Sequence, residues 1–396
     1  MTSTNQHAQS TPSRSRRRRT IGLSGAILTG LSAAVLLAAT AAAAPRGTRA
    51  QSSLQKGADA LVATGAPGVV LFARHGNRTV SLTSGLGELS TKTPMRADDR
   101  FRVASITKSY TATVVLQLVG EGRLRLTDTV ERWLPGLVPG GDAISIRQLL
   151  NHTSGLADFE YDPVVLAPYL AGDLSHPWTP RRLVQIAVSH PPLFAPGTDE
   201  SYSSTNYLLA GLIVEARTGH TLGSELKRRI FGPLHLRATS FPMTARMPSP
   251  HAHGYLVINK PPATDVTGLY PFPWAAGAII SNASDTATFY RALLSGRLLS
   301  PRMLHAMQTT HAQKHFDIPG QRYGLGLGRY STACGTAWGH NGAFPGYYAY
   351  NFTSTDGQRQ AVLEVNADPT SVSKTTVLKS IHLLEKAYCT GAQPSP

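Results

Sequence analysis

Apolar residues recur along the chain in patterns that place strands near its two ends and helices between them. Leu54 to Val62 has the spacing of an amphipathic helix, whereas Gly68 to Ala73 is a short apolar run of the kind found in buried strands. A turn separates this run from a second predicted strand, Thr79 to Leu82. Strand patterns return only at Tyr323 to Gly328 and at Tyr347 to Phe352. The sheet is therefore expected to form from two segments that lie far apart in sequence.

Helical patterns dominate the residues between these strands. We predict helices at Lys108 to Glu121, Ser145 to Asn151, Pro180 to Val188, Asn206 to Arg217, Leu222 to Ile230 and Ser284 to Leu294. A final helix is expected to carry on one face Val377, Leu378, Ile381 and Leu384. Sheet segments at about 51–108 and 270–396, with a helical part at about 109–269, predict a two-subdomain α/β (α+β) fold. The cleft between two such subdomains is the natural place for an active site.

The first fifty residues differ in kind from the rest. Five arginines cluster between positions 14 and 19, the apolar run Ile21 to Ala44 follows, and no acidic residue occurs, which is the pattern of an export signal. General secretory and twin-arginine export both fit, as does cleavage after Ala43 or Ala50. The apolar run is long enough to span a bilayer, so an uncleaved anchor is the alternative. We expect a signal peptide with a short linker, then one enzyme domain over 51–396 that is secreted or cell-wall associated.

Charge and cysteine content narrow the classes of partner. The formal net charge is +15, but seven arginines and no acids lie in the first fifty residues, which leaves +8 on the remainder. No dense basic run with interleaved aromatics remains, so nucleic-acid binding is not expected, while anionic cell-wall polymers are compatible with the charge. Cys334 and Cys389 are the only cysteines. In an exported chain we expect them to form a disulfide; two free buried thiols are the alternative.

A serine followed three residues later by a lysine is the first candidate for chemistry. The pattern occurs four times, at Ser53/Lys56, Ser105/Lys108, Ser224/Lys227 and Ser371/Lys374. Residues i and i+3 share a helix face, so the lysine can reach the serine hydroxyl. Only Ser105 begins a strongly apolar, hence central, helix; Ser53 and Ser371 lie near the termini, and Ser224 lies on a basic surface helix. Ser105 is therefore the predicted nucleophile.

The serine needs a base. Lys108 can serve only if burial and neighbouring cations lower its pKa. Tyr202, in the segment Ser201 to Tyr207, is the second candidate, because a phenol near Lys108 would be biased toward phenolate; a packing tyrosine is the alternative. Trp338 to Ala343 is a predicted edge strand in which a glycine lets the substrate backbone approach, and His340 would supply a donor or a partial cation.

Three motifs thus occur in the order Ser-x-x-Lys, Tyr-Ser-Ser and His-Asn-Gly, beginning at Ser105, Tyr202 and His340. In this order they resemble the serine β-lactamases and penicillin-recognising hydrolases, closest to the soluble D-alanyl-D-alanine carboxypeptidases and class C β-lactamases. The resemblance covers nearly all of the chain after the export signal. It implies an antiparallel sheet flanked by helices, with an all-helical subdomain inserted.

The resemblance also implies roles for individual residues. Ser105 would be acylated, Lys108 and Tyr202 would form the proton-transfer pair, and His340 would face the substrate carboxylate. The backbone N–H groups of Ser105 and Ala343 would form the oxyanion hole. The further substrate-binding candidates are Ser204, Asn341 and Gly342.

One motif departs from the family pattern. The family's Tyr-x-Asn is here Tyr202-Ser203-Ser204, so a hydroxyl replaces an amide that contacts both the lysine and the substrate. Ser204 can make fewer hydrogen bonds than asparagine, and Asn206 is a candidate to compensate. His152, in a segment that the family carries beside the cleft, is expected to be scaffold.

The resemblance implies a secreted D-alanyl-D-alanine carboxypeptidase that binds penicillin and acts on cell-wall peptides through an acyl-enzyme. A class C-like β-lactamase and a serine esterase of the same fold are the first alternatives. A non-catalytic penicillin- or wall-binding protein is the second. The expected partners are a small peptide, β-lactam or ester substrate and peptidoglycan, and the protein is expected to be a monomer.

Other chemistries have weaker support in the sequence. No Gly-x-Ser-x-Gly elbow occurs, which argues against an α/β-hydrolase. His251 and His253 would be half a metal site, but no cysteine or acid cluster completes it, so no metal is expected. Gly324, Gly326 and Gly328 alternate without a following helix, unlike a dinucleotide fingerprint, so no cofactor is expected.

Overall fold

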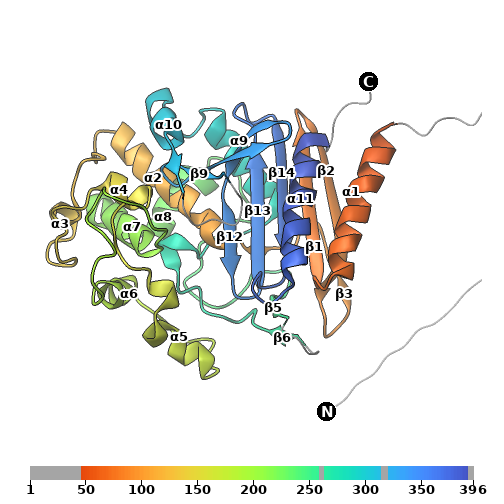
Figure 1. Ribbon diagram of the computed structural model, residues 1–396, viewed down its shortest axis with the longest axis horizontal. Helices are drawn as coiled ribbons and strands as arrows, with labels where there is room; N and C mark the ends of the chain where they lie inside the picture. Colours follow the sequence, from red (N-terminus) through yellow and green to blue (C-terminus); the bar gives the residue numbers. More distant parts are fainter. Residues whose placement is uncertain (1–45, 258–262, 314–319, 391–396) are drawn as a thin grey trace, which may run out of the picture. The chain divides into compact units, whose positions relative to one another are not determined.

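The computed structural model describes residues 46–257, 263–313 and 320–390, and within these ranges ten strands form one antiparallel sheet (Figure 1). In spatial order the strands are β3 (Thr93–Pro94), β2 (Arg78–Glu88), β1 (Gly68–His75), β14 (Arg359–Val365), β13 (Tyr347–Thr353), β11 (Gly335–Gly339), β10 (Gly328–Thr332), β9 (Arg322–Tyr323) and β8 (His311–Ala312), and β12 (Asn341–Phe344) also pairs with β13. Val69 lies opposite Val365, so the first long strand pairs with the last. The predicted two-segment sheet is therefore confirmed.

Both faces of β1 are buried, which explains why its sequence is continuously apolar rather than alternating. Side chains alternate between faces along a strand. Leu71 and Ala73 join the core beneath α1 (Arg46–Ala63) and α11 (Lys374–Thr390). Val70 and Phe72 join the larger core on the opposite face. Helix α9 (Ala283–Leu294) packs on that second face against β13 and β14.

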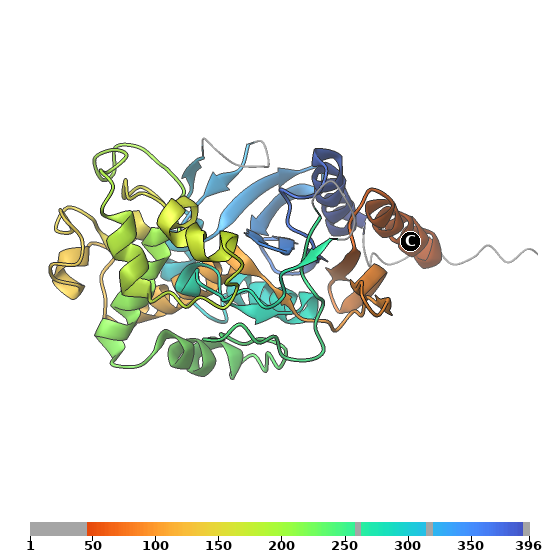
Figure 2. The same cartoon turned by 90° about the horizontal axis from the view of Figure 1, so that it is seen from below.

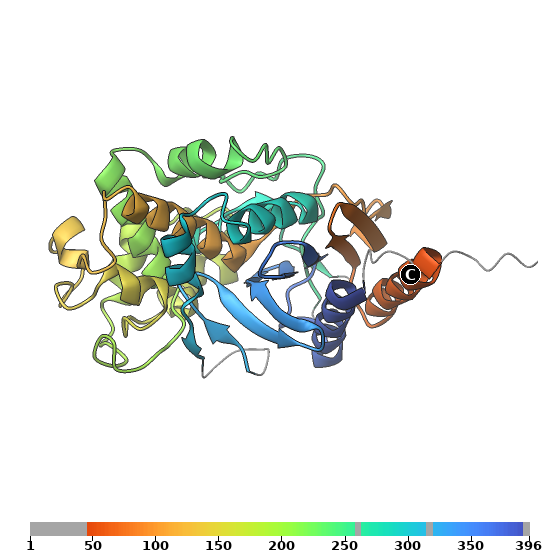
Figure 3. The same ribbon diagram turned by 90° about the horizontal axis from the view of Figure 1, so that it is seen from above.

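Short helices occupy the chain between β4 (Phe101–Arg102) and β7 (Ile280–Ser281), which pair with each other. They are α2 (Thr107–Gly120), α3 (Val130–Trp133), α4 (Ile146–Leu150), α5 (Pro163–Leu170), α6 (Pro180–Ala187), α7 (Thr205–Thr218) and α8 (Leu222–Leu226). The same segment contains β5 (Tyr255–Leu256), which pairs with β6 (Thr264–Asp265). Helix α10 (Pro301–Gln308) follows β7 and α9 in the chain. Figures 2 and 3 show α1 and α11 on one side of the sheet and the α2–α8 helices on the other.

Most helices that the sequence predicted are observed within a few residues of their expected ends, but α1 begins at Arg46 rather than Leu54, and α3, α5 and α10 were not expected. Local chemistry explains one boundary well. The Ser145 hydroxyl accepts the Gln148 N–H while the Gln148 side chain accepts the Ser145 N–H, a capping box that starts α4. In α8 the predicted helix continues as a π-helical turn, Lys227–Phe231.

Two predicted details are wrong. The strand expected over Tyr323 to Gly328 is interrupted, because Gly326 adopts φ +77° and its N–H donates to the Leu150 carbonyl. The turn packs so closely that a β-carbon on Gly324 would lie 2.0 Å from the Met307 carbonyl oxygen. In α11, Leu378 is 45% exposed, because the buried stripe runs instead through Ser380 and Leu383.

Cys334 and Cys389 form the expected disulfide, which joins the turn between β10 and β11 to the end of α11. The bond closes a loop with a sequence separation of 55 residues. In the chain-entropy account, we expect the Cys334→Ser/Cys389→Ser variant to lose about 4 kcal/mol of unfolding free energy. Urea denaturation of the oxidised protein and the double variant checks this value. Equal midpoints would show that the bond does not constrain the unfolded chain.

The expected export segment lies almost wholly outside the described residues, which begin at Arg46 in α1. The apolar run proposed as signal core or anchor, Ile21 to Ala44, is not described. Among the helices of 46–257, 263–313 and 320–390, none has the length and apolar character needed to cross a membrane.

Candidate active site

Ser105 and Lys108 lie where the chain leaves β4 and enters α2. Ser105 is in a 3₁₀ turn, Ala104–Ile106, that leads directly into α2, and Ala104 holds a φ of +48° that is uncommon for a residue with a side chain. The i, i+3 spacing brings the two side chains together, with Lys108 Nζ donating to Ser105 Oγ at 2.9 Å. This is the contact that the Ser-x-x-Lys pattern predicted.

The Lys108 ammonium is fully buried and has three acceptors. Besides Ser105 Oγ, it donates to Ser204 Oγ at 3.1 Å and to the Ala276 carbonyl oxygen at 3.0 Å. Burial lowers the pKa of Lys108 to about 8, although the nearby carboxylates of Glu160 and Asp158 act in the opposite direction. A useful fraction of Lys108 is therefore neutral near physiological pH. Only that form can take the serine proton.

Tyr202 lies beside the pair, but not in the expected charge state. Its ring centroid is 4.8 Å from Lys108 Nζ, and a hydrogen bond links its side chain to Ser105. Burial nevertheless raises the pKa of Tyr202 well above its ordinary value, and the Ser105 bond offsets this only in part. The predicted bias toward phenolate is therefore wrong, because desolvation outweighs the nearby cation. Lys108 has the pKa suited to a base, and Tyr202 has that of a proton donor or relay.

We expect Tyr202→Phe to lower kcat by about 10²-fold, the lower part of the range for loss of a positioned proton-transfer group. The apparent pKa of kcat/KM should stay near 8, because Lys108 would still be the titrating base. A pH–rate profile of the variant measures both effects. If the alkaline rise in activity disappeared with the phenol, Tyr202 rather than Lys108 would be the base.

Ser204 reaches Lys108, whereas Asn206 does not replace the missing amide. The Asn206 side chain contacts His152 Nδ1 at 3.2 Å and accepts the Ser154 hydroxyl at 2.5 Å. Both the oxygen and the nitrogen of the Asn206 amide therefore already have partners, Ser154 and His152. The prediction that Asn206 replaces the amide missing at position 204 is wrong. The lysine instead relies on Ser204 and a backbone carbonyl.

His152 holds the segment that carries Tyr202. Its carbonyl accepts the Ser201 N–H, its Nδ1 accepts the Ser203 N–H at 3.2 Å, and its ring lies 4.3 Å from the Tyr202 ring. Burial lowers the pKa of His152 well below its ordinary value, which keeps the ring neutral. These contacts fit the scaffold role expected from the sequence.

His340 was expected to supply a donor or a partial cation, and because it is buried and neutral the second of these alternatives is wrong. His340 lies between β11 and β12, where Nδ1 bonds the Asn341 carbonyl at 2.5 Å and Nε2 bonds the Tyr323 hydroxyl at 2.8 Å. Burial, with a smaller effect from Lys108, lowers the pKa of His340 to about 3. Both ring nitrogens therefore have protein partners, and the ring carries no charge at neutral pH.

Strand β12 runs close to the turn that holds Ser105. A β-carbon on Gly342 would lie 2.2 Å from the Val103 carbonyl oxygen, so this position requires glycine. From the sequence we expected a glycine in this strand to make room for the substrate backbone. In the structure, the backbone that lies close to Gly342 is that of Val103 in the same chain. This packing brings the β12 backbone at Asn341 and Ala343 to the Ser105 turn. The oxyanion pair of Ser105 and Ala343 N–H groups stays a prediction.

Several residues of the site were not predicted. The Ala276 carbonyl receives a lysine hydrogen bond, and Tyr323 holds His340. Asp158 and Glu160 act electrostatically on both Lys108 and Tyr202. Burial raises the pKa of Asp158 to about 7. The sequence offers no periodic signal for these residues, because they lie in short 3₁₀ turns, at a turn's start or in the two-residue strand β9, and only folding brings them to the site.

His251 and His253 do not lie within the site. Their rings stack 5.2 Å apart, and His253 Nδ1 bonds Asp265 at 2.7 Å. Within the part of the chain that the structure describes, no three His, Cys, Asp or Glu side chains gather in a way that could hold a metal ion.

A serine hydrogen-bonded to a buried lysine of lowered pKa at the start of a helix, beside an antiparallel sheet, is the arrangement of a serine hydrolase. Residues 54–384 match the family described as Beta-lactamase, and the chain belongs to that family. The expected β-lactamase-like fold and the hydrolase class are thereby confirmed.

The proteins similar to this chain include a penicillin-binding protein, a D-aminopeptidase and a D-stereospecific amidohydrolase. Penicillin-binding protein 4* of Bacillus subtilis is 25% identical over 335 residues, which cover 80% of this chain and 72% of that protein. A D-aminopeptidase of Cereibacter sphaeroides is 25% identical over 348 residues, 86% of this chain but only 65% of the relative's length. The solved D-stereospecific amidohydrolase of Streptomyces sp. is 40% identical with a TM-score of 0.75, covering 83% of this chain and 97% of that one.

Proposed function

We propose that this protein is a serine amidohydrolase that cleaves the amide bond following a D-configured acyl residue, through an acyl-enzyme on Ser105. The hydrogen bond from Lys108 to Ser105, with the Lys108 pKa lowered to about 8, is the observation that carries the proposal. Similarity to the D-stereospecific amidohydrolase supports the choice of amide substrates. It is also the basis for the D configuration.

The proposed reaction uses groups already in contact. Neutral Lys108 accepts the Ser105 proton as Oγ attacks the carbonyl carbon, and the N–H groups of Ser105 and Ala343 would stabilise the oxyanion. The leaving amine takes a proton from Lys108, directly or through the neutral Tyr202 phenol. Water then attacks the ester carbonyl, and the same groups return the proton to Ser105.

Charge around the site favours one kind of substrate. Carboxypeptidase action on D-Ala-D-Ala releases an amino acid whose carboxylate needs a cation or hydrogen-bond donors, but His340 is neutral and both its nitrogens are engaged. Asp158 and Glu160 instead bring negative potential toward Lys108. We therefore propose a D-aminoacyl amide or short peptide with a free amino group on the acyl residue.

The D-alanyl-D-alanine carboxypeptidase expected from the sequence is the second candidate, supported by the likeness to penicillin-binding protein 4*. One preparation assayed on D-alanine p-nitroanilide, its N-acetyl form, the L-enantiomer, diacetyl-Lys-D-Ala-D-Ala, nitrocefin and a short-chain ester separates the candidates. We expect the free-amine D-anilide to give at least a tenfold higher kcat/KM than the N-acetyl and L forms. A dominant rate on the diacetyl peptide would favour the carboxypeptidase, and a dominant nitrocefin or ester rate would favour those alternatives. Acylation by penicillin without turnover of any substrate would favour a binding protein.

Export, contact with peptidoglycan and the monomeric state stay predictions from the sequence. We propose that the chain is exported on the basic and apolar segment of residues 14–44. Mass spectrometry of the protein from the culture medium tests this proposal. An N-terminus at Ala44 or Gln51 would support cleavage, and an intact N-terminus in the membrane fraction would support the anchor.

A further inference from the structure

A cavity of ≈ 780 Å³ lies at the opposite end of α2 from Ser105. Its walls come from the last turn of α2, the following loop at 122–127, α4 and the length of α10 with its two capping residues. Ser105 precedes the first residue of α2, and a helix of 14 residues spans about 21 Å at 1.5 Å per residue. The cavity is therefore separate from the candidate active site. Its volume is in the range of small-molecule pockets.

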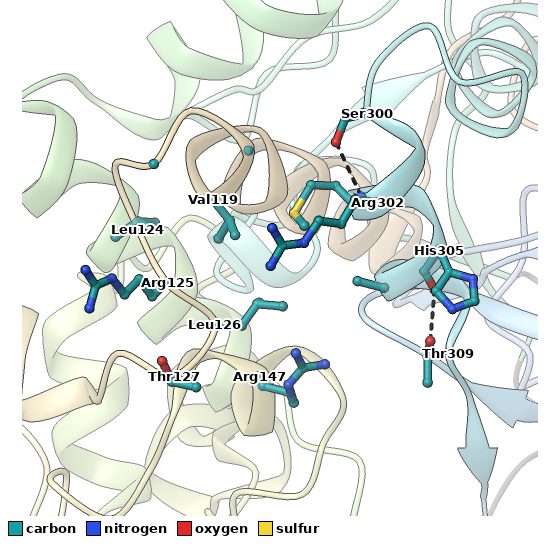
Figure 4. Close-up of a pocket in the computed structure, with 14 residues that line it drawn as sticks. Val119, Leu124, Arg125, Leu126, Thr127, Arg147, Ser300, Arg302, His305 and Thr309 are labelled. Carbon is teal, nitrogen blue, oxygen red and sulfur yellow. Dashed lines mark hydrogen bonds between the residues drawn. The ribbon is translucent and has the colours of Figure 1, made fainter.

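Apolar, hydroxyl and cationic side chains line the cavity, and Arg125 and His305 belong to the lining together with Arg147 and Arg302. Val119, Leu124 and Leu126 form an apolar floor, whereas Arg147 of α4 and Arg302 of α10 extend toward the hollow from either side of Leu126 (Figure 4). No aspartate or glutamate lines the cavity. The surroundings therefore combine positive charge with a surface suited to an apolar group.

Arg147 and Arg302 are both exposed, and within the described parts of the chain no hydrogen bond or ion pair involves either side chain, so the two guanidinium groups are open to solvent and to a ligand. Two acids flank the loop, and both have other partners. Glu121 forms ion pairs with Arg229 and Arg123. Asp128 is turned inward. Its carboxylate accepts the Arg125 N–H at 2.9 Å and the Trp133 Nε1–H at 3.2 Å. Local acids therefore do not neutralise this cationic pair.

We infer that this cavity binds a small organic phosphate monoester, with the phosphate between Arg147 and Arg302 and the apolar body over Leu126. Guanidinium forks bind the oxygens of phosphate in pairs. A phosphomonoester carries between about one and a half and two negative charges at pH 7 on three acceptor oxygens, which matches two arginines from separate elements. A carboxylate offers one charge and two oxygens, so it matches the pair less well.

Isothermal titration calorimetry of the full chain at low salt tests this inference, with phenyl phosphate as the probe. We expect phenyl phosphate to bind at least tenfold more tightly than inorganic phosphate, which lacks the apolar body, or benzoate, which lacks the second charge. Equal affinity for all three would overturn the inference. Benzoate binding more tightly than phenyl phosphate would assign the cavity to carboxylates and overturn it as well.

Variants locate the binding. Arg147→Gln/Arg302→Gln should weaken phenyl phosphate binding at least tenfold, while Arg78→Gln, at an exposed hairpin arginine, should leave it unchanged. Ser105→Ala should also bind normally, which excludes the active site. The double variant should keep its melting temperature and its hydrolytic rate. Unaltered binding in a folded double variant would overturn the inference.

Discussion

Replacing Ser105 with alanine is expected to reduce kcat/KM on the preferred amide substrate by about 10⁴-fold or more, the size of loss seen when a nucleophile that acts together with its base is removed. The fold should persist, because Ser105 is only partly buried and its hydroxyl contacts the proposed base, Lys108. Initial rates of the purified variant and its melting temperature measure the two effects separately.

The other copies of the Ser-x-x-Lys pattern provide a matched control. Ser224 precedes Lys227 by the same spacing, but its hydroxyl contacts Thr221 on the surface at the start of α8. Ser224→Ala should therefore retain nearly full activity. Intact-mass spectrometry with a sulfonyl fluoride, which reacts with a nucleophilic serine and needs no carboxylate site, should show an adduct on the wild type and on Ser224→Ala but none on Ser105→Ala. An adduct on Ser105→Ala, or loss of the adduct in Ser224→Ala, would contradict the assignment.

The second large effect is expected at Lys108. Arginine keeps the positive charge but does not deprotonate in proteins, so Lys108→Arg should lose about 10³-fold in kcat, within the range for general-base catalysis. In the wild type the base is the neutral form, and neutral Lys108 becomes more abundant as pH rises. Activity should therefore increase about tenfold per pH unit below a pKa near 8 and level off above it.

A pH–rate profile of kcat/KM, which reports the free enzyme, checks this expectation. Lys227→Arg is the matched control and should leave both the rate and the profile unchanged, because Lys227 lies outside the site. A wild-type profile that falls between pH 6 and 9 would contradict Lys108 as the base. So would a Lys108→Arg variant with normal activity.

Local patterns were sufficient for much of the fold. The apolar run of β1, the amphipathic spacing of α1 and the start of α2 were all readable, because strand and helix periods depend on neighbouring residues. The glycines at 324 and 326 led to a wrong prediction, a continuous strand where the structure has a turn. A glycine in an apolar stretch fits both a strand and a turn, and here contacts with Met307 and Leu150 from distant helices select the turn.

The sequence by itself indicated the family and the contact between Ser105 and Lys108, and it predicted site roles for Tyr202 and His340, because motif order and i, i+3 spacing are properties of the chain. Only the tertiary structure decided their charge states. It left Tyr202 protonated and His340 neutral, gave Lys108 a pKa near 8, and brought Asp158 and Glu160 close enough to act on it. The physical reason is that protonation depends on desolvation and on charges from distant segments, which no local pattern records.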